Sequence, residues 1–289
     1  MIRDVEIILL GTGTSAGVPV IGCDCDVCTS DDPRDHRLRC SACVRFTDRQ
    51  GQQRVILIDT SPDLREQALR ARLKRCDGIV YTHNHVDHTF GLDEVRRFNV
   101  LMNASIDVWA DEHTMQSLLR IYTHIFQRDK NVNDSFVATL IPRLIRPPDP
   151  IDLFGLRFTP LQLLHGKLPV LGFRLEALDG AGRIAETQPA PLPAAYCTDV
   201  SAIPPETWPQ LTGLTTLILD MLRPRRHATH FSVDEAVGAA GEIGARRTWF
   251  IHMTHNIRHA ELDPRLPEAM HLGHDGLAIT AAHFTSPPS

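Results

Sequence analysis

Three histidines and an aspartate stand within six residues of one another, directly after a short apolar run; they are His83, His85, Asp87 and His88. Alternate residues of an extended chain point to the same side, so we expect His83 and His85 to bind one cation together. If the chain then turns into a helix, Asp87 and His88 reach a second position beside the first. Histidine and aspartate ligands without cysteine suit a borderline or hard divalent ion such as Zn, Mn or Fe. The alternative is a polar loop in which histidines happen to cluster.

Three predicted strands end in residues of the same kinds, namely His165, Asp199 and His252. Any one of them has a simpler explanation, because a polar residue can end a strand merely by meeting solvent. Three such endings together with the first cluster predict two coordination spheres. The first comprises His83, His85 and His165, the second Asp87, His88 and His252, and Asp199 bridges them. Two ions roughly 3.5–4 Å apart can share and activate a water and stabilise a displacement at phosphorus.

Two further residues are candidates for supporting roles. Asp59 ends the apolar run Val55–Ile58 and is a candidate for holding the second ring nitrogen of a ligand histidine; equally, it could cap the helix that follows. His230 directly precedes a predicted helix. Histidine has the pKa that suits protonation of a leaving oxygen near pH 7, so His230 is the candidate general acid. The alternative for His230 is a polar turn that leads into the helix.

The cysteines predict a separate metal site. Cys23, Cys25 and Cys28 form a C-x-C-x-x-C motif, and a structural zinc ion usually takes four ligands. The fourth ligand is one of Cys40, Cys43 or a distant histidine. We favour His255, three residues beyond His252, which leaves Cys40 and Cys43 as small buried apolar residues at the start of a strand.

The composition narrows the classes of function. A formal net charge of −5 argues against a general nucleic-acid surface, which would be basic. No apolar run approaches the roughly 20 residues that cross a bilayer, and the first residues lack the pattern of a signal peptide. Seven cysteines, five of them between Cys23 and Cys43, favour metal binding in a reducing compartment. We therefore expect a cytoplasmic protein with no membrane partner, and a homodimer as the commonest oligomer.

Short apolar runs rich in β-branched residues predict strands at Val5–Leu10, Ala42–Thr47, Arg54–Asp59, Gly78–Thr82, Ile106–Ala110, Leu156–Leu164, Val170–Leu175, Ala194–Thr198, Thr215–Leu219 and Thr248–His252. Helical spacing predicts helices at Pro62–Arg75, Asp111–Phe126 and Ser232–Gly244, with Asp111 and Ser232 as N-caps. This order of elements indicates sheets that are covered by helices on their outer faces.

Two segments are less regular, and we expect the whole chain, residues 1–289, to form a single domain. The segment Gln127–Pro150 is interpreted as a lid or insertion, and Asp179–Pro193 as an exposed hairpin tip or loop. The tail Thr285–Ser289 is expected to fray.

The H-x-H-x-D-H residues resemble the metallo-β-lactamase superfamily. Residues 11–45 contain the run Gly11–Pro19 and, after it, the cysteine motif, and these two features resemble the PhnP-like branch of the superfamily. The namesake of this branch is a phosphoribosyl 1,2-cyclic phosphate phosphodiesterase. Other matching features are His165-x-Lys167, Thr198-Asp199, His230 before a helix, His252-x-x-His255 and Asp275-Gly276. The chain departs from the branch in the longer Gln127–Pro150 segment, in His274 and in Gly166.

The resemblance implies an αββα sandwich of two mixed β-sheets with helices on the outer faces and the metals at one edge. It also implies that His255 completes the structural zinc site, that His230 assists the leaving group and that Lys167 lies beside the substrate phosphate. The implied cofactors are two divalent ions, Zn or Mn, in the active site and one structural Zn.

The leading hypothesis is a phosphodiesterase that hydrolyses a small cyclic phosphate or nucleotide-like diester through hydroxide activated by two metals, with Asp87, Asp199 and His230 as catalytic residues. A nuclease that processes RNA would favour a projecting basic arm, and no segment qualifies. Thioester or lactone hydrolases of this superfamily lack the cysteine site. PqqB-like binding proteins, which are not hydrolases, lose most of the H-x-H-x-D-H ligands, whereas here the set is complete.

Overall fold

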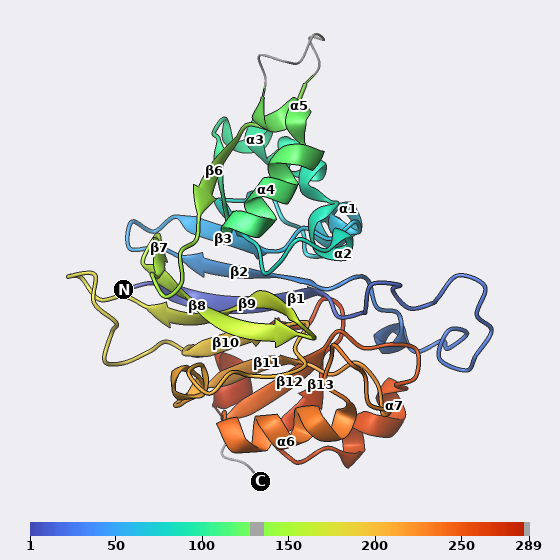
Figure 1. Cartoon of the computed structure of the whole chain (residues 1–289). Helices are drawn as coiled ribbons and strands as arrows, with labels where there is room; N and C mark the ends of the chain where they lie inside the picture. Colours follow the sequence, from blue (N-terminus) through green and yellow to red (C-terminus); the bar gives the residue numbers. More distant parts are fainter. Residues whose placement is uncertain (128–135, 286–289) are drawn as a thin grey trace.

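The computed structural model describes residues 1–127 and 136–285. Two seven-stranded β-sheets pack face to face, and helices cover the outer side of each sheet (Figure 1). Both sheets are mixed, with antiparallel and parallel pairs side by side. The predicted αββα sandwich is therefore confirmed.

The first sheet is formed mainly by the N-terminal half of the chain. Its strands, in spatial order, are β14 (Ala278–Ile279), β1 (Arg3–Gly11), β2 (Ser41–Thr47), β3 (Gln53–Ile58), β4 (Gly78–Val80), β5 (Ile106–Ala110) and β6 (Leu140–Leu144). Strands β3 to β6 run parallel, so each needs a crossover connection. These connections and their neighbours carry α1 (Leu64–Arg70), α2 (Val86–Thr89), α3 (Arg96–Met102), α4 (Glu112–Ile121) and α5 (Thr123–Phe126).

The second sheet is formed by the C-terminal half. Its strands, in spatial order, are β13 (Met270–Leu272), β12 (Arg247–Ile251), β11 (Thr216–Asp220), β10 (Ala194–Cys197), β9 (Leu168–Ala177), β8 (Leu156–His165) and β7 (Ile151–Leu153). Its helices are α6 (Val233–Ile243) and α7 (His259–Leu262), and short 3-10 turns occupy Pro33–Asp35, Leu92–Val95, Trp208–Leu211, Asp263–Arg265 and Ala281–Phe284. Strands β10 to β13 run parallel, so their carboxyl ends lie at one edge.

The core has three layers, which explains why the strands are apolar on both faces. In β1, Ile7 and Leu9 point into the cluster between the two sheets, whereas Ile8 and Leu10 point into the cluster beneath the first set of helices. A third cluster lies between the second sheet and α6, and includes Leu217, Leu219 and Phe250. Burial on both faces holds the strand ends firmly, and the strand ends carry the predicted ligands.

The predicted helices form with shifted ends. Helix α6 begins after Ser232, whose side chain forms a capping box with Glu235, and ends at Gly244 in the left-handed conformation. Asp111 caps α4 by accepting from the backbone N–H of Thr114, but the predicted helix Asp111–Phe126 is interrupted at Tyr122. The predicted helix Pro62–Arg75 is an α-helix only over Leu64–Arg70.

The less regular segments fall partly outside the described residues. Within Gln127–Pro150, residues 128–135 are not described, and Leu140–Leu144 forms the edge strand β6, so that part is not an irregular loop. The lid interpretation stays a prediction. The segment Asp179–Pro193 connects β9 to β10 without a strand or helix of its own, although Leu192 is buried. Of the tail Thr285–Ser289, only Thr285 is described. Among the described residues, no helix combines the length and apolar character needed to cross a membrane.

Candidate metal centres

The seven predicted active-site ligands come from four segments that meet at one edge of the sandwich. His83 and His85 follow β4, and the short helix α2 then places Asp87 and His88 beside them. His165 ends β8, whereas Asp199 and His252 follow β10 and β12. The fold thus brings together residues far apart in the sequence, from His83 to His252, which are 169 positions apart.

Asp199 lies at the centre of this cluster. Its carboxylate oxygens lie 3.2 Å from Nε2 of His88, 3.4 Å from Nε2 of His252 and 4.0 Å from Nε2 of His83. Three groups with ligand atoms within 4.8 Å of one another include Asp199; they are His83/His88/Asp199, His85/His165/Asp199 and Asp199/His230/His252. A fourth group, Asp87/His88/His252, matches one predicted sphere. His85 and His165 lie together as expected, whereas His83 groups with His88 and Asp199, and no group of described residues within this distance contains His83 with both His85 and His165.

The buried imidazole nitrogens fit a cation. His88 donates from Nδ1 to the Asp59 carboxylate at 2.8 Å, and His165 donates from Nδ1 to the carbonyl of Thr229 at 2.7 Å. Nε2 of His83, His88 and His252 is buried, and none of these atoms has a hydrogen-bond partner among the described residues. Such unpaired buried polar atoms are costly. A divalent ion is the partner that this donor set lacks, and hydrogen bonds on the opposite nitrogen are what metal-ligating histidines usually make.

Asp59 occupies the supporting position that its place in the sequence indicated. Its carboxylate accepts from Nδ1 of His88, and also from the backbone N–H and the hydroxyl of Thr82 at 2.9 and 2.8 Å. Thr82 directly precedes His83, and its hydroxyl is 2.9 Å from Nδ1 of His83. One buried carboxylate therefore orients His88 directly and His83 through Thr82.

The electrostatics of the cluster are those of ionised carboxylates among imidazoles. Burial alone would raise the pKa of Asp199, but the neighbouring His252 and His88 hold this pKa well below its usual value. Burial would lower the pKa of His252, yet Asp199 and Asp87 raise it to about 8. Burial, with His88 nearby, holds the pKa of His83 well below its usual value. The carboxylates thus attract positive charge into a buried site, and bound divalent ions would supply that charge.

Three of these residues have a strained backbone. Asp59, Asp199 and His252 have φ values of 62°, 57° and 66°, in the left-handed region that residues other than glycine rarely adopt. Asp59 and His252 directly follow β3 and β12, and Asp199 lies two residues beyond the end of β10. Strain of this kind collects at functional sites because the surrounding structure enforces it.

His230 lies beside the cluster with a partner that the sequence analysis missed. Its Nδ1 is 3.0 Å from the carboxylate of Asp220, which is fully buried and also 3.5 Å from Nδ1 of His252. The ring centroid of His230 is 4.5 Å from that of His165. Asp220 is the last residue of β11, so the signal that identified His165, Asp199 and His252 was present for it as well.

A cavity of about 400 Å³ opens beside His230 and falls within the usual size range of small-molecule sites. It is lined by Ser201, Arg226, His227, Ala228, His230 and Glu235. Lys167 is exposed in the two-residue turn between β8 and β9 and does not line this cavity. Its predicted contact with a substrate phosphate stays a prediction.

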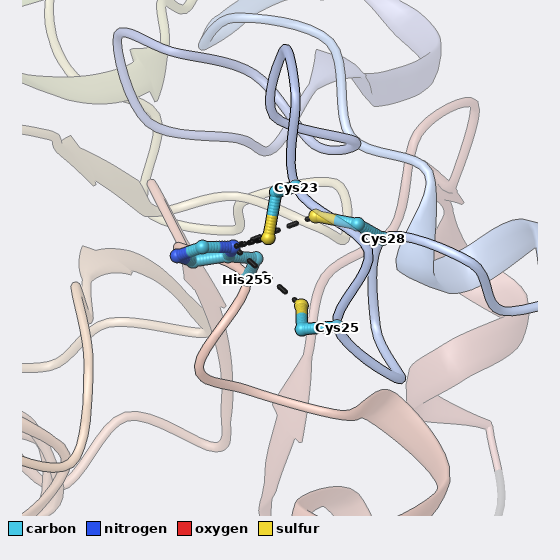
Figure 2. Close-up of side chains that lie close together, drawn as sticks. All are labelled: Cys23, Cys25, Cys28 and His255. Atoms are coloured by element: carbon cyan, nitrogen blue, oxygen red, sulfur yellow. Dashed lines mark hydrogen bonds between the residues drawn. The ribbon is translucent and has the colours of Figure 1, made fainter.

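The second predicted site also assembles. Cys23, Cys25 and Cys28 surround Nδ1 of His255, with Sγ–Nδ1 distances of 3.2, 3.6 and 3.4 Å (Figure 2). All four ligand atoms lie within 4.8 Å of one another. Three thiols and an imidazole converging on one point form the donor set of a structural zinc site.

Cys40 and Cys43 take no part in this group. Both are fully buried at the start of β2 and within it, and burial raises the pKa of each thiol to about 12. They therefore behave as small apolar residues, as expected.

The comparisons with known proteins agree with this geometry. The model of the β-lactamase superfamily domain matches residues 54–253, which include all seven candidate ligands. A protein of Porphyromonas gingivalis (strain ATCC BAA-308 / W83) named octanoyltransferase is 33% identical over 274 residues, which cover 93% of this chain and 50% of that protein. The chain thus spans about half the length of this curated relative.

Two solved structures extend the comparison. A diphosphatase from the PhnP family is 38% identical, with a TM-score of 0.82, and the match covers 96% of this chain and 98% of that one. Zn²⁺-bound PqqB from Methylobacterium extorquens shares the fold at 17% identity, with a TM-score of 0.71 and coverage of 95% and 99%. With the family model matching well over half of its residues, this chain belongs to the metallo-β-lactamase superfamily and to its PhnP-like branch.

Proposed function

We propose that the protein is a phosphodiesterase that hydrolyses a small cyclic phosphate or nucleotide-like phosphodiester with the help of two divalent ions. The observation that carries this proposal is the convergence of seven histidine and aspartate side chains, Asp199 at their centre, with three buried Nε2 atoms that have no hydrogen-bond partner among the described residues. A pair of adjacent ions, when bound, supplies an activated water and stabilises the charge that develops in a displacement at phosphorus.

The chain's own residues divide the remaining work. His83, His85, His165 and Asp199 would hold one ion, and Asp87, His88, His252 and Asp199 the other; either Zn or Mn suits these ligands. Asp59 and the carbonyl of Thr229 keep His88 and His165 in the orientation that presents Nε2 to the ion. A third ion, structural Zn, would be held by Cys23, Cys25, Cys28 and His255.

His230 is the proposed proton donor to the leaving oxygen. Its Nδ1 donates to Asp220, which leaves Nε2 available to give a proton to a substrate group. Because His230 lines the cavity beside the metal cluster, the leaving part of the substrate would lie in that cavity. General acid catalysis requires a positioned imidazole, and the hydrogen bond to Asp220 supports this role for His230.

The relatives support displacement at phosphorus without fixing the substrate. The 38% identical PhnP-family structure is named a diphosphatase, and cleavage of a diphosphate is also an attack on phosphorus. PqqB supports the fold alone at 17% identity. The complete ligand set in this chain favours catalysis over a binding role that would need only one zinc.

A second candidate is hydrolysis of an acyl thioester, and the relative named octanoyltransferase favours testing it. That name describes a protein of which this chain spans about half, so acyl chemistry need not belong to the shared part. The cysteine site also distinguishes this chain from the thioester hydrolases of the superfamily.

The test combines metal analysis with two substrates. Purified protein should contain about three ions per chain and should hydrolyse bis-p-nitrophenyl phosphate but not octanoyl-coenzyme A. Hydrolysis of the thioester alone would replace the proposal with the second candidate, and about one ion per chain would indicate a protein that binds zinc only. A cytoplasmic location and a homodimer stay predictions.

A further inference from the structure

Arg37 is an arginine whose side chain is completely buried beside the cysteine loop. Its guanidinium donates to the carboxylate of Asp35 at 2.9 Å and to two backbone carbonyls, those of Thr254 at 3.2 Å and Ile257 at 2.9 Å. The Arg37–Asp35 ion pair is fully buried. A buried ion pair need not stabilise the fold, because the cost of removing both charges from water opposes their attraction. The contacts of Arg37 therefore point to a role in holding a particular segment.

That segment is the turn that carries ligands of both metal centres. Thr254 lies between His252, a ligand of the active-site cluster, and His255, the fourth ligand of the cysteine site. The turn begins in the left-handed conformation at His252. Its neighbour Met253 is held by the backbone of the segment that follows β1, because it donates to the carbonyl of Thr12 at 2.9 Å and accepts from the N–H of Thr14 at 3.2 Å.

Arg37 is equally tied to the cysteine loop. Its backbone exchanges two hydrogen bonds with Val18, at 2.7 and 2.8 Å, and Val18 packs in the small cluster that contains Val27 and Cys28. Asp35, its ionic partner, also accepts from the hydroxyl of Ser30 at 2.9 Å. The same arginine thus contacts the loop that provides the thiolates and the turn that provides both histidines.

We propose that Arg37 is a positioning residue that holds the His252–His255 turn and thereby links the affinities of the two metal centres. The inference rests on the ligand sets proposed above. If the turn loosens, His252 and His255 lose their placement together, so both sites weaken. Linkage of this kind is reciprocal, so loss of the structural ion also weakens binding in the active site.

The test removes the ion pair without leaving a lone buried charge. The double variant Arg37→Met/Asp35→Asn replaces both charges; the amide oxygen of the asparagine can still accept from the backbone N–H of His259, and its amide nitrogen then faces the Ser30 hydroxyl, which can accept from it. The control is Arg39→Met/Asp63→Asn, which removes an ion pair that starts from the same strand-like segment but contacts helix α1 rather than the turn. Arg37→Lys tests whether a conserved cation restores the effect.

The readout is metal binding, which does not depend on the substrate. In the Co²⁺-substituted protein, the thiolate charge-transfer band reports the cysteine site alone, the total bound Co²⁺ minus that occupancy gives the active site, and a chelator titration gives the affinities. We expect the Arg37→Met/Asp35→Asn protein to bind ions at both sites about 10-fold more weakly, the lower end of the cost of losing an outer partner. The control should retain the affinities of the unmodified protein, and Arg37→Lys should recover part of the loss.

Unchanged metal affinity and unchanged visible bands in the Arg37→Met/Asp35→Asn protein, with only a lower melting temperature, would show that Arg37 is merely structural. Weakening of one site alone would also reject the linkage. If the unmodified protein bound no pair of ions in the active site, the proposed function would fail before this inference was tested.

Discussion

The carboxylate of Asp220 accepts from Nδ1 of His230 at 3.0 Å and lies 3.5 Å from Nδ1 of His252. One buried acid at the end of β11 therefore supports both the proposed proton donor and a proposed metal ligand. This arrangement fixes which nitrogen of His230 faces the substrate, because Nδ1 is already engaged. The hydrogen bond explains how a buried histidine at the end of an exposed turn keeps a defined orientation beside the candidate metal cluster.

His230→Ala should preserve the metal content and slow turnover by about 10²–10⁴-fold on a diester with a poor leaving group, the usual contribution of a general acid. The reason is that the other histidine lining the cavity, His227, does not have the hydrogen bond to Asp220 that orients His230. The loss should be smaller for bis-p-nitrophenyl phosphate, whose leaving group needs little protonation. Steady-state kinetics on both substrates check this, and an equal loss on both would reject the role of acid.

Asp199→Ala should abolish turnover because its carboxylate contacts histidines of both proposed spheres. Elemental analysis should show loss of the active-site ions while the cysteine site retains at least part of its zinc. A useful control is Asp234→Ala, which changes an acid in the first turn of α6 away from the cluster. Retention of both active-site ions by the Asp199→Ala protein would contradict the bridging assignment.

Cys25→Ser should release the structural zinc and lower the free energy of unfolding by about 2 kcal/mol or more, because metal binding and folding are coupled at such sites. Denaturant unfolding and zinc analysis measure the two effects. Cys43→Ala is the comparison, since Cys43 is a buried thiol outside the site and its loss should leave the zinc in place. Normal zinc content and stability in the Cys25→Ser protein would remove Cys25 from the ligand set.

Gly166→Ala should displace His165 and weaken active-site metal binding. Gly166 has a φ of 64°, and a Cβ there would lie 2.8 Å from Cγ2 of Thr229, the residue whose carbonyl accepts from His165. The strained backbone and the contact together should cost about 1–2 kcal/mol of stability. Gly182→Ala is a matched control, because its φ is 78° but nothing lies within 4 Å. Equal metal affinity in the two variants would count against this view.

The free energy of unfolding should fall as the pH drops from about 6.5 toward 4, in part because of His259. Burial lowers the pKa of His259 to about 4, whereas the pKa of an unfolded histidine is about 6.5. In this range the unfolded chain binds a proton that the folded chain does not, so the contribution is fully present above pH 6.5 and is lost toward pH 4. His259→Gln should flatten this part of the urea-unfolding profile, and profiles that stay parallel would exclude His259 as a cause.

The candidate metal ligands could be predicted because each belongs to a short sequence pattern. Histidines and aspartates that end apolar strands identify the edge where strands meet, and the C-x-C-x-x-C spacing identifies a metal loop. Asp220 was missed although it directly follows the predicted strand Thr215–Leu219, just as His165 follows Leu156–Leu164. Its role depends on His230, which approaches from a different turn.

Other features depend on tertiary contacts that no local pattern reveals. Strands β13 and β14 are only three and two residues long, and they exist because longer neighbours provide the pairing. Strand β6 forms from a Pro-containing, mostly exposed segment as the edge partner of β5, where proline is tolerated. Arg37 gave no signal at all, since an arginine between two charged segments looks like a surface residue until its burial is known.

Within ten residues, Met270 to Ile279, the chain provides one edge strand of each sheet: β13 for the second sheet and β14 for the first. Between these strands, Asp275 accepts from the backbone of Thr12 and of Leu38. During synthesis, the first sheet therefore keeps one edge unpaired, and the base of the cysteine loop stays unanchored, until residues 270–279 have left the ribosome. A nascent chain stalled before Met270 would leave one edge of each sheet unpaired and open to pairing with other chains.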